Sequence, residues 1–320
     1  MRASSRNLVA NLVLFRITRS TFGLASRLAL FAVGLAGCPS DDPPPGDPEG
    51  GIEAGSNDVR PDIDFGTFRR FCDLPGSVQY TESGLVTVPG GLATPSVGFL
   101  TLPKGYCAHF FASVGNTRQL RFAPGGELFV ASPTKSTTGG GPGGSSAIVV
   151  LPDDDHDGIA DKVTTFLADL PATQGLLFAK QGSYLYYQDE TKILRMPYRA
   201  GDREPSGASE TVANITIHTS SLHWPKTLDE ADDGTIFVAN GDDENIDCQA
   251  TRPFRGGILK LDGTPGGTPV AKGFRNPIAL RCQRGHNLCF AVELSRDYSA
   301  AEGGREKVVP VRAGDDWGYP

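Results

Sequence analysis

The sequence has little that would build long helices, cross a membrane or hold zinc. Long stretches with the 3.6-residue apolar period of an amphipathic helix are nearly absent, which argues against a helical protein. Beyond the first 37 residues, no stretch is long and apolar enough to span a bilayer. The 6 cysteines form no CxxC pair, so the spacing of a zinc site is missing. What remains is a chain of 320 residues with 40 glycines and 24 prolines, which predicts many turns.

Short apolar runs stand where helices would be expected. The runs LRFAP, ELFVA, AIVVLP and TIFVAN alternate in polarity or carry β-branched and aromatic residues, and both features are typical of strands. A chain of 320 residues that is 39% hydrophobic can bury one large core or two smaller ones. The sequence therefore predicts an all-β protein.

The N-terminal region has the pattern of an export signal. Residues 1–37 contain five arginines and no acidic residue, and they end in the apolar run LALFAVGLAG before Cys38. The stretch LAGC resembles the lipobox of bacterial lipoproteins, which implies that residues 1–37 are removed and that Cys38 carries a lipid. The protein would then be exported and anchored to a bacterial membrane, in the periplasm or at the cell surface. An ordinary cleaved signal is the alternative.

The segment that follows predicts a tether. Within residues 38–70, the stretch PSDDPPPGDPEGGIEAGSN at 39–57 is proline, glycine and acid with almost nothing to bury, so we expect disorder. Residues 71–320 would form the folded domain. Without the first 37 residues the chain has 25 basic and 37 acidic residues, a net charge of −12. Nucleic acid is then excluded as an expected partner, because phosphate binding needs a basic surface.

Five cysteines remain after Cys38, in a compartment that permits disulfides. Cys282 and Cys289 flank the turn QRGHNL and could face each other across a hairpin. Cys72 with Cys107, or Cys248 with Cys282, are rival pairings, and an odd number leaves one thiol free.

A repeat runs through the folded part. QLRFAPGGELFVA, GLLFAKQGSYLYY, TLDEADDGTIFVA and IALRCQRGHNLCFA each place a turn with glycine between two apolar strands. Their turn glycines, Gly126, Gly182, Gly234 and Gly285, are 56, 52 and 51 residues apart. A period near 50 predicts a β-propeller, with four repeats visible from about residue 115 to 320. A weaker strand pair, GLVTVP and VGFLTLP, precedes them, and we expect it to complete the last blade.

An acidic loop has calcium-site spacing. In DDDHDGIAD, acidic side chains fall at positions 1, 3, 5 and 9 of the loop that binds Ca²⁺, with glycine at position 6 and a backbone carbonyl at position 7. Position 12 is Thr164 rather than glutamate, which weakens the match, and a solvated acidic loop is the alternative. The expected ligands are Asp153, Asp155, Asp157, Ile159 and Asp161.

Three polar loops are expected to meet at one rim of the propeller. His223 precedes the first strand of the third repeat, and Asp242 follows its second strand, so the carboxylate could orient the imidazole and raise its basicity. Arg275 and Asn276 lie in the same kind of loop one blade later, before a strand that starts at a proline. A lone histidine is more often a surface or capping residue, so spacing alone does not settle its role.

These residues carry a resemblance to a known family. LPKGYCAHFFASVGNTRQLRFAPGGELFVA, then HW with GTIFVANGD, then GFRNPIAL, ELSRD and GDDWGYP resemble the soluble quinoprotein glucose and sorbosone dehydrogenases over residues 100–320. That family is a six-bladed β-propeller that uses pyrroloquinoline quinone (PQQ) and Ca²⁺. The resemblance implies PQQ- and calcium-dependent oxidation of a sugar or aldose, with electrons passed to an external acceptor.

The resemblance also implies roles for residues. His223 matches the general base that takes the proton of the substrate hydroxyl, and Asp242 matches the acid beside it. Arg275 matches the arginine that contacts the quinone and steadies charge on its oxygen, with Asn276 beside it as a second cofactor contact. The stretch ELSRDYSA departs from the family's calcium-binding segment, where Glu293 and Asp297 are only nearby candidates.

The family's chain continues for about two blades beyond the element that matches GDDWGYP. Because this chain ends at Pro320, we expect an incomplete propeller with about four blades. The alternative function is a non-catalytic propeller lipoprotein that binds a carbohydrate or a protein partner through the same rim. A calcium-dependent lactonase or related hydrolase on a similar propeller is a third hypothesis.

Overall fold

The computed structural model describes most of the chain from residue 71 onward. The described residues are 13–14, 71–90, 97, 99–135, 144–179, 182–215, 223–243, 245, 256–297 and 305–319. Cys38, Cys248, the predicted tether and all of the predicted signal except residues 13–14 lie outside this part. Among the described residues, no helix is long and apolar enough to cross a membrane.

The described chain consists of β-sheets, turns and one short 3₁₀ helix, η1 (Phe71–Asp73). It divides into two compact units, one with residues 71–185 and 196–208 and the other with residues 186–195 and 209–319. One sheet contributes strands to both units. The prediction of an all-β protein is confirmed.

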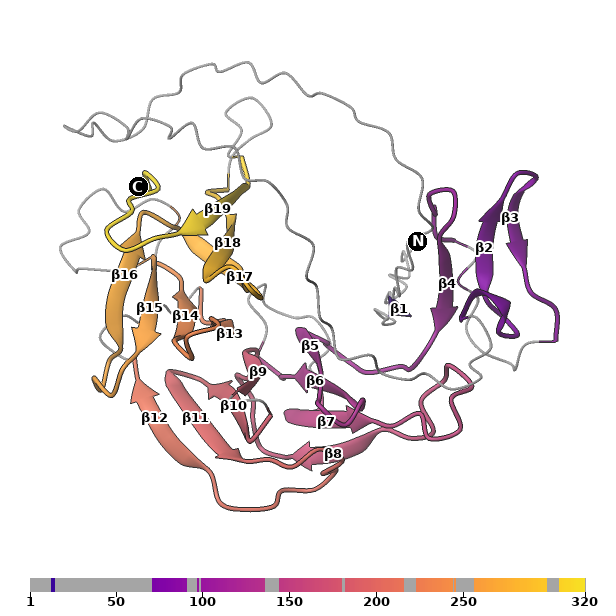
Figure 1. Cartoon of the computed structure of the whole chain (residues 1–320), viewed down its shortest axis with the longest axis horizontal. Coiled ribbons are helices and arrows are strands. Elements are labelled where there is room, and N and C mark those ends of the chain that lie inside the picture. Colours follow the sequence, from indigo (N-terminus) through magenta and orange to yellow (C-terminus); the bar gives the residue numbers. More distant parts are fainter. Residues whose placement is uncertain are drawn as a thin grey trace, which may run out of the picture. The chain divides into compact units, whose positions relative to one another are not determined.

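Five sheets follow one another along the chain (Figure 1). The first has the order β1-β4-β2-β3 and is the only one of the five whose order departs from the sequence. Its strands are β1 (Val13–Leu14), β4 (Cys107–Phe110), β2 (Val78–Thr81) and β3 (Gly84–Thr87). The second is a four-stranded meander of β5 (Gln119–Phe122), β6 (Leu128–Ser132), β7 (Ala147–Leu151) and β8 (Thr164–Leu167).

The remaining three sheets repeat this meander. The third is formed by β9 (Leu176–Ala179), β10 (Tyr184–Asp189), β11 (Lys192–Pro197) and β12 (Glu210–Asn214). The fourth is formed by β13 (Leu228–Glu230), β14 (Ile236–Asn240), β15 (Gly257–Leu261) and β16 (Thr268–Lys272). The fifth has three described strands, β17 (Asn276–Gln283), β18 (Leu288–Leu294) and β19 (Lys307–Val311).

The turn glycines explain why the repeat recurs at this spacing. Gly126, Gly182, Gly234 and Gly285 join the first two strands of the last four sheets, and their φ angles are 98°, 83°, 84° and 81°. This left-handed conformation is easy for glycine and strained for most other residues. In the first three of these turns the glycine N–H donates to the carbonyl of an alanine three residues earlier. The predicted repeat is confirmed, and these four sheets are blades of a β-propeller.

The apolar residues of neighbouring blades pack together within the second unit. Phe274 is fully buried in a cluster with Ile258 and Ala271 of the fourth sheet and Leu280 and Ala291 of the fifth. Phe274 belongs to the stretch GFRNP, so this cluster fixes the backbone immediately before Arg275. The placement of Arg275 therefore follows from core packing.

One predicted strand is wrong. GLVTVP contains β3 as expected, but the described residues of VGFLTLP form turns rather than a strand. Val97 and Leu102 are buried beside Val78 and Ala108, and the N–H of Leu100 donates to the carbonyl of Val97. The apolar residues of this segment therefore serve loop packing, and β2 pairs with β3 on one side and with Cys107–Phe110 on the other. Whether the sheet completes the last blade stays a prediction.

Two of the cysteine pairings considered from the sequence are present. Cys282 and Cys289 stand opposite each other in β17 and β18 and form a disulfide. Cys72 of η1 is joined to Cys107 of β4. No free cysteine occurs in the described part of the chain.

Candidate functional site

His223 is held in a buried position between β12 and β13. Its residue surface is 6% exposed, and its Nδ1 is hydrogen-bonded to the backbone carbonyl of Asp242, which follows β14. A carbonyl oxygen can only accept, so Nδ1 carries the proton in this contact and Nε2 keeps its lone pair when the ring is neutral. The arrangement presents Nε2 as the atom able to accept a proton.

The pKa of His223 is shifted downward, whereas the sequence analysis expected a more basic imidazole. Burial lowers the pKa of the imidazole from its ordinary value of 6.5, the hydrogen bond to the Asp242 carbonyl raises it, and the charge of Arg275 lowers it. The expected carboxylate contact is replaced by a backbone contact, since Asp242 reaches His223 through its carbonyl while its Oδ1 accepts from the N–H of Asp243 at 2.6 Å. The net direction favours a neutral base rather than a more basic one.

Arg275 and Asn276 lie beside His223, as the sequence predicts, but both are buried. They are 6% and 8% exposed. The N–H of Asp242 donates to the Arg275 carbonyl at 2.7 Å, which ties the two loops together. A Cβ added at Gly241 would lie 2.3 Å from the His223 Cβ and 3.2 Å from the Asn276 Oδ1. The structure therefore brings all four predicted site residues together within the second unit.

Two polar atoms in this group are buried without a hydrogen-bond partner among the described residues. They are the Nε of Arg275 and the Oδ1 of Asn276. A buried donor or acceptor that stays unpaired costs free energy, and such atoms in native proteins usually meet a ligand or an ordered water. One donor and one acceptor next to His223 therefore fit a polar ligand.

The other side of Arg275 is held by the segment after β18. Its Nη1 donates to the Ser295 carbonyl at 2.8 Å, and its Nη2 pairs with Asp297 at 2.8 Å. The Asp297 backbone is fixed in turn by two hydrogen bonds with the Asn245 side chain, of 2.7 and 3.2 Å. These contacts fix the two terminal nitrogens of the guanidinium, Nη1 and Nη2, and its Nε could donate to a ligand.

The nearby carboxylates are already engaged. Glu293 is fully buried, its Oε1 accepts from the Arg275 N–H at 2.6 Å, and its Oε2 pairs with Lys307 at 2.9 Å. Asp297 neutralises Arg275. A carboxylate whose charge is matched by a lysine is a poor ligand for Ca²⁺, which needs several oxygens at close range. Glu293 and Asp297 therefore do not fit a calcium centre in this arrangement.

The C-terminal segment GDDWGYP is bound to the residues just before Arg275. The Trp317 N–H donates to the Lys272 carbonyl at 3.0 Å, and the Tyr319 N–H donates to the Gly273 carbonyl at 3.0 Å. A Cβ at Gly273 would lie 2.3 Å from the Asp316 Oδ1, so only glycine fits there. These contacts connect GDDWGYP to GFRNP. The C-terminal segment holds the backbone just before Arg275, where the chain enters β17.

Two further residues support His223 and were not singled out from the sequence. Gln188 of β10 and Lys226 are both fully buried. Gln188 accepts from the Lys226 N–H at 3.1 Å and donates to the Trp224 carbonyl at 2.9 Å. A buried glutamine at the end of a strand has no distinctive spacing. The sequence signal for Lys226 is only its position in HWPK, three residues after the histidine.

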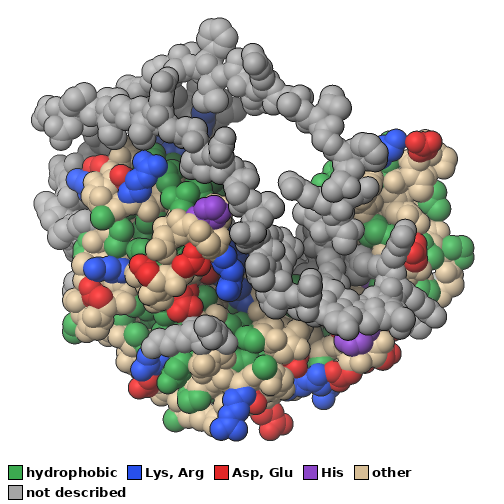
Figure 2. Space-filling model, viewed as in Figure 1, with side chains coloured by type: hydrophobic (Ala, Val, Ile, Leu, Met, Phe, Trp, Pro, Cys, Tyr) green, Lys and Arg blue, Asp and Glu red, His purple; other side chains and the backbone are tan. Residues whose placement is uncertain are grey.

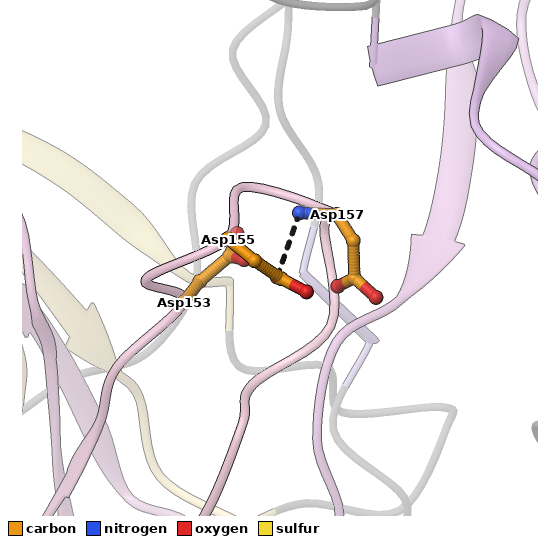
Figure 3. A group of neighbouring side chains, drawn as sticks. All are labelled: Asp153, Asp155 and Asp157. Atoms are coloured by element: carbon orange, nitrogen blue, oxygen red, sulfur yellow. Dashed lines mark hydrogen bonds between the residues drawn. The ribbon is translucent and has the colours of Figure 1, made fainter.

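The acidic loop between β7 and β8, in the first unit, gathers three of its predicted ligands. One oxygen each from Asp153, Asp155 and Asp157 lies within 4.8 Å of the others (Figure 3). Asp155 also accepts from the Asp157 N–H at 3.2 Å, and Asp157 accepts from the Ile159 N–H at 2.8 Å. Such hydrogen bonds can hold the loop in shape without an ion, so they are compatible with a calcium site and with a solvated acidic loop.

The two other predicted calcium ligands and the charge of the loop add detail. Asp161 accepts from the Asp154 N–H at 2.7 Å and braces the base of the loop, and Ile159 stays a predicted ligand. Among the described residues the Oδ1 of Asp153 is buried without a hydrogen-bond partner, and burial followed by the charge of Asp157 raises the pKa of this carboxyl. A cation near Asp153 would relieve both effects.

The surface around these sites carries mixed charge. On the face shown in Figure 2, acidic and basic side chains of the described residues are interspersed. Small ligands are therefore not drawn to one large charged patch on this face.

Comparisons with known proteins place the fold. A family model described as a domain of unknown function (DUF7133) matches residues 94–276. No curated protein sequence matches the chain. Among solved structures, the iodide structure of a Trichoderma reesei enzyme of Carbohydrate-Active Enzymes Family AA12 is 19% identical with a TM-score of 0.54. The calcium structure of a Trichoderma reesei enzyme of that family is 19% identical with a TM-score of 0.52.

The matched share limits what these structures say. The alignment with the iodide structure covers 66% of this chain and 57% of the other, and that with the calcium structure covers 66% and 56%. A PQQ-bound aldose sugar dehydrogenase from Streptomyces coelicolor is 18% identical, with a TM-score of 0.48 and coverage of 66% and 64%. The chain thus spans less than two thirds of the solved structures it resembles, and the likeness is one of fold: a β-propeller of the quinoprotein dehydrogenase type.

Proposed function

We propose that this chain, which belongs to the family described as a domain of unknown function (DUF7133), carries out PQQ- and calcium-dependent oxidation of a sugar or aldose. The family description names no activity, so the proposal is argued from the residues of the His223 site. The reaction would remove the hydroxyl proton and the hydride equivalent of a CH–OH group. An external acceptor would take the electrons onward. A carbohydrate substrate is supported by the carbohydrate-active family of the solved structures with the same fold.

One observation carries the proposal. The imidazole of His223 is buried with Nδ1 bound to a carbonyl, and the nearby Arg275 Nε and Asn276 Oδ1 are buried without hydrogen-bond partners among the described residues. Hydroxyl oxidation needs a base for the proton, which a neutral imidazole supplies, and a bound hydride acceptor, which the two polar atoms could hold and orient. The unpaired atoms fit the carbonyl oxygens and ring N–H of PQQ, and they fit the hydroxyl groups of a sugar.

Each residue has a specific task in this proposal. His223 accepts the hydroxyl proton at Nε2, and its low pKa keeps it neutral and ready at pH 7. Asp242 holds the tautomer through its carbonyl. Arg275 and Asn276 bind and orient the cofactor, and the guanidinium stabilises negative charge on an oxygen of the ligand. When bound, PQQ supplies a two-electron acceptor that no amino-acid side chain provides.

Calcium is proposed at the acidic loop, with Asp153, Asp155 and Asp157 as side-chain ligands, Ile159 as a carbonyl ligand and Asp161 as the fifth. The support is the three converging carboxylates and the unpaired Asp153 Oδ1. An ion at this loop would be structural, because none of the residues proposed for proton transfer or cofactor binding belongs to the loop. Export and a lipid anchor at Cys38 complete the proposal as expectations from the N-terminal sequence.

The test is a titration of PQQ into the full chain with and without Ca²⁺, followed by dye reduction with a panel of aldoses. Binding together with dye reduction would establish the activity. Binding of sugar without PQQ binding would favour the non-catalytic carbohydrate-binding propeller. No binding of either by folded protein would overturn the proposal. A parallel assay for lactone hydrolysis without an acceptor tests the hydrolase hypothesis.

A further inference from the structure

Lys226 is buried where a lysine is rarely found. Its residue surface is 0% exposed, and it is among the largest fully buried side chains of the described protein. Lysine is almost never fully buried unless its ammonium is paired, because removing a charge from water is costly. Lys226 lies three residues from His223, so its contacts bear on the placement of the histidine.

The contacts of Lys226 converge on the backbone that carries His223. Its Nζ donates to the carbonyl of Trp224 at 3.2 Å and to the carbonyl of His223 at 3.5 Å. Its own N–H donates to Gln188 at 3.1 Å, and Gln188 donates to the same Trp224 carbonyl at 2.9 Å. The segment HWP is therefore clamped from two sides, by a side chain of its own loop and by one from β10.

Carbonyl satisfaction alone does not require a charge. Gln188 already shows that a neutral amide can satisfy the Trp224 carbonyl. An ammonium adds a positive charge beside the imidazole, and that charge disfavours a second proton on the ring. Holding His223 in place and disfavouring its protonated form would use both the hydrogen bonds and the charge of Lys226.

We infer that Lys226 is a positioning residue for His223: its buried ammonium holds the carbonyls of His223 and Trp224 and keeps the imidazole as a neutral base with its proton on Nδ1. This inference rests on the proposed function, in which His223 is the base. Lys226 acts through His223 and is assigned no contact with substrate or cofactor.

Several charged groups act on the imidazole. Lys226 and Arg275 lower its pKa, Asp297 raises it, and the Asp242 carbonyl raises it through the hydrogen bond. Removing the charge of Lys226 should therefore raise the pKa of His223. Removing a remote lysine charge should leave that pKa unchanged, which provides the control.

The experiment is a nitrogen-15 NMR titration of histidine-labelled full chain, in which ring nitrogen shifts report the tautomer and the pKa. We expect His223 of the wild-type protein to be neutral at pH 7 with its proton on Nδ1. Lys226→Met should raise its pKa and mix the tautomers. Lys260→Met is the matched control, because that lysine lies on β15 with its side chain 41% exposed and should change neither.

Activity gives a second readout. Lys226→Met should lower kcat by about 10²-fold while KM for the sugar stays within about twofold, as expected for a misplaced base rather than lost binding. If Lys226→Met does not fold, Lys226→Gln keeps a donor for the carbonyls without the charge, and it should also raise the His223 pKa.

The inference is overturned if wild-type His223 carries its proton on Nε2, or if a folded Lys226 variant has the wild-type tautomer and pKa. These NMR readouts need no turnover, so they separate the two proposals. Protein with no dehydrogenase activity but with the expected histidine behaviour would refute the function and keep the inference. An active wild-type protein whose folded Lys226 variants keep the tautomer and pKa of His223 would support the function and refute the inference.

Discussion

At the scale of single residues, the burial of His223 makes a defined prediction for its removal. His223→Ala should lower turnover by about 10²–10⁴-fold, the usual contribution of a general base. PQQ affinity should stay within a few fold, since cofactor contacts are assigned to other residues. Steady-state dye reduction and PQQ titration measure the two effects. Wild-type turnover in the variant would remove His223 from the mechanism.

The same residue predicts how activity depends on pH. Burial lowers the pKa of His223 below its ordinary value of 6.5. The base works only when neutral, so kcat/KM should reach a plateau on the alkaline side and fall at more acidic pH, with a midpoint below 6.5. A pH–rate profile measures this midpoint. A midpoint above 6.5 would show that Asp297 and the Asp242 carbonyl outweigh burial and the two cations.

Arg275 should govern cofactor affinity rather than proton transfer. Its Nε is buried without a hydrogen-bond partner among the described residues, while the rest of the guanidinium is held by Ser295 and Asp297. Arg275→Ala should weaken PQQ binding by about 10–100-fold, the range expected for one lost hydrogen bond to a charged group. Arg281→Ala is the control, because Arg281 lies on β17, the strand that follows Arg275, and its side chain is 58% exposed. Equal affinities in wild type and Arg275→Ala would leave GFRNP with a structural role only.

At the scale of elements, Gly241 sets how closely the loop after β14 approaches His223. A methyl group there would lie 2.3 Å from the His223 Cβ and 3.2 Å from the Asn276 Oδ1, so one of the two loops must move. Gly241→Ala should therefore lower turnover by about 10²-fold, the effect of a small misplacement of a catalytic group. Gly207→Ala is the control. Its Cβ would lie 3.2 Å from the Pro197 side chain in the first unit, so turnover should stay at the wild-type level. Dye-reduction assays of both variants decide the point.

The elements also show what the sequence could predict. The four turn glycines recur because each hairpin needs a left-handed residue, so composition and spacing revealed the blades. VGFLTLP misled because burial of Val97 and Leu102 in a loop leaves the same apolar signal as a strand. The meeting of His223, Asp242, Arg275 and Asn276 followed from their equivalent places in successive blades.

The support of the site was harder to predict. Lys226 and Gln188 read as surface residues because lysine and glutamine are usually exposed, yet both are fully buried. The contact of His223 with the Asp242 carbonyl was also hidden, since a sequence shows side chains and leaves backbone acceptors implicit. Polar groups that become partners only through tertiary packing carry no periodic signal of their own.

At the scale of the whole molecule, the proposed chemistry and the proposed calcium loop lie in different compact units. The loop with Asp153, Asp155 and Asp157 belongs to the first unit, and the His223 site belongs to the second. Calcium at this loop should therefore stabilise the first unit, whereas PQQ should stabilise the second unit. Thermal unfolding separates these effects because each ligand stabilises only what it binds.

The last prediction concerns calcium and stability. Ca²⁺ at 100 times its dissociation constant should stabilise the native chain by about 2.7 kcal/mol, and a chelator should reverse this. Asp155→Asn removes one of three converging carboxylates from an exposed position, so it should abolish the calcium-dependent rise in Tm with little loss of stability in chelator. Asp169→Asn removes an exposed carboxylate after β8 and should keep the rise. A Tm that ignores Ca²⁺ in wild type would show that the loop is a solvated acidic turn, held by its own hydrogen bonds from the Asp157 and Ile159 N–H groups.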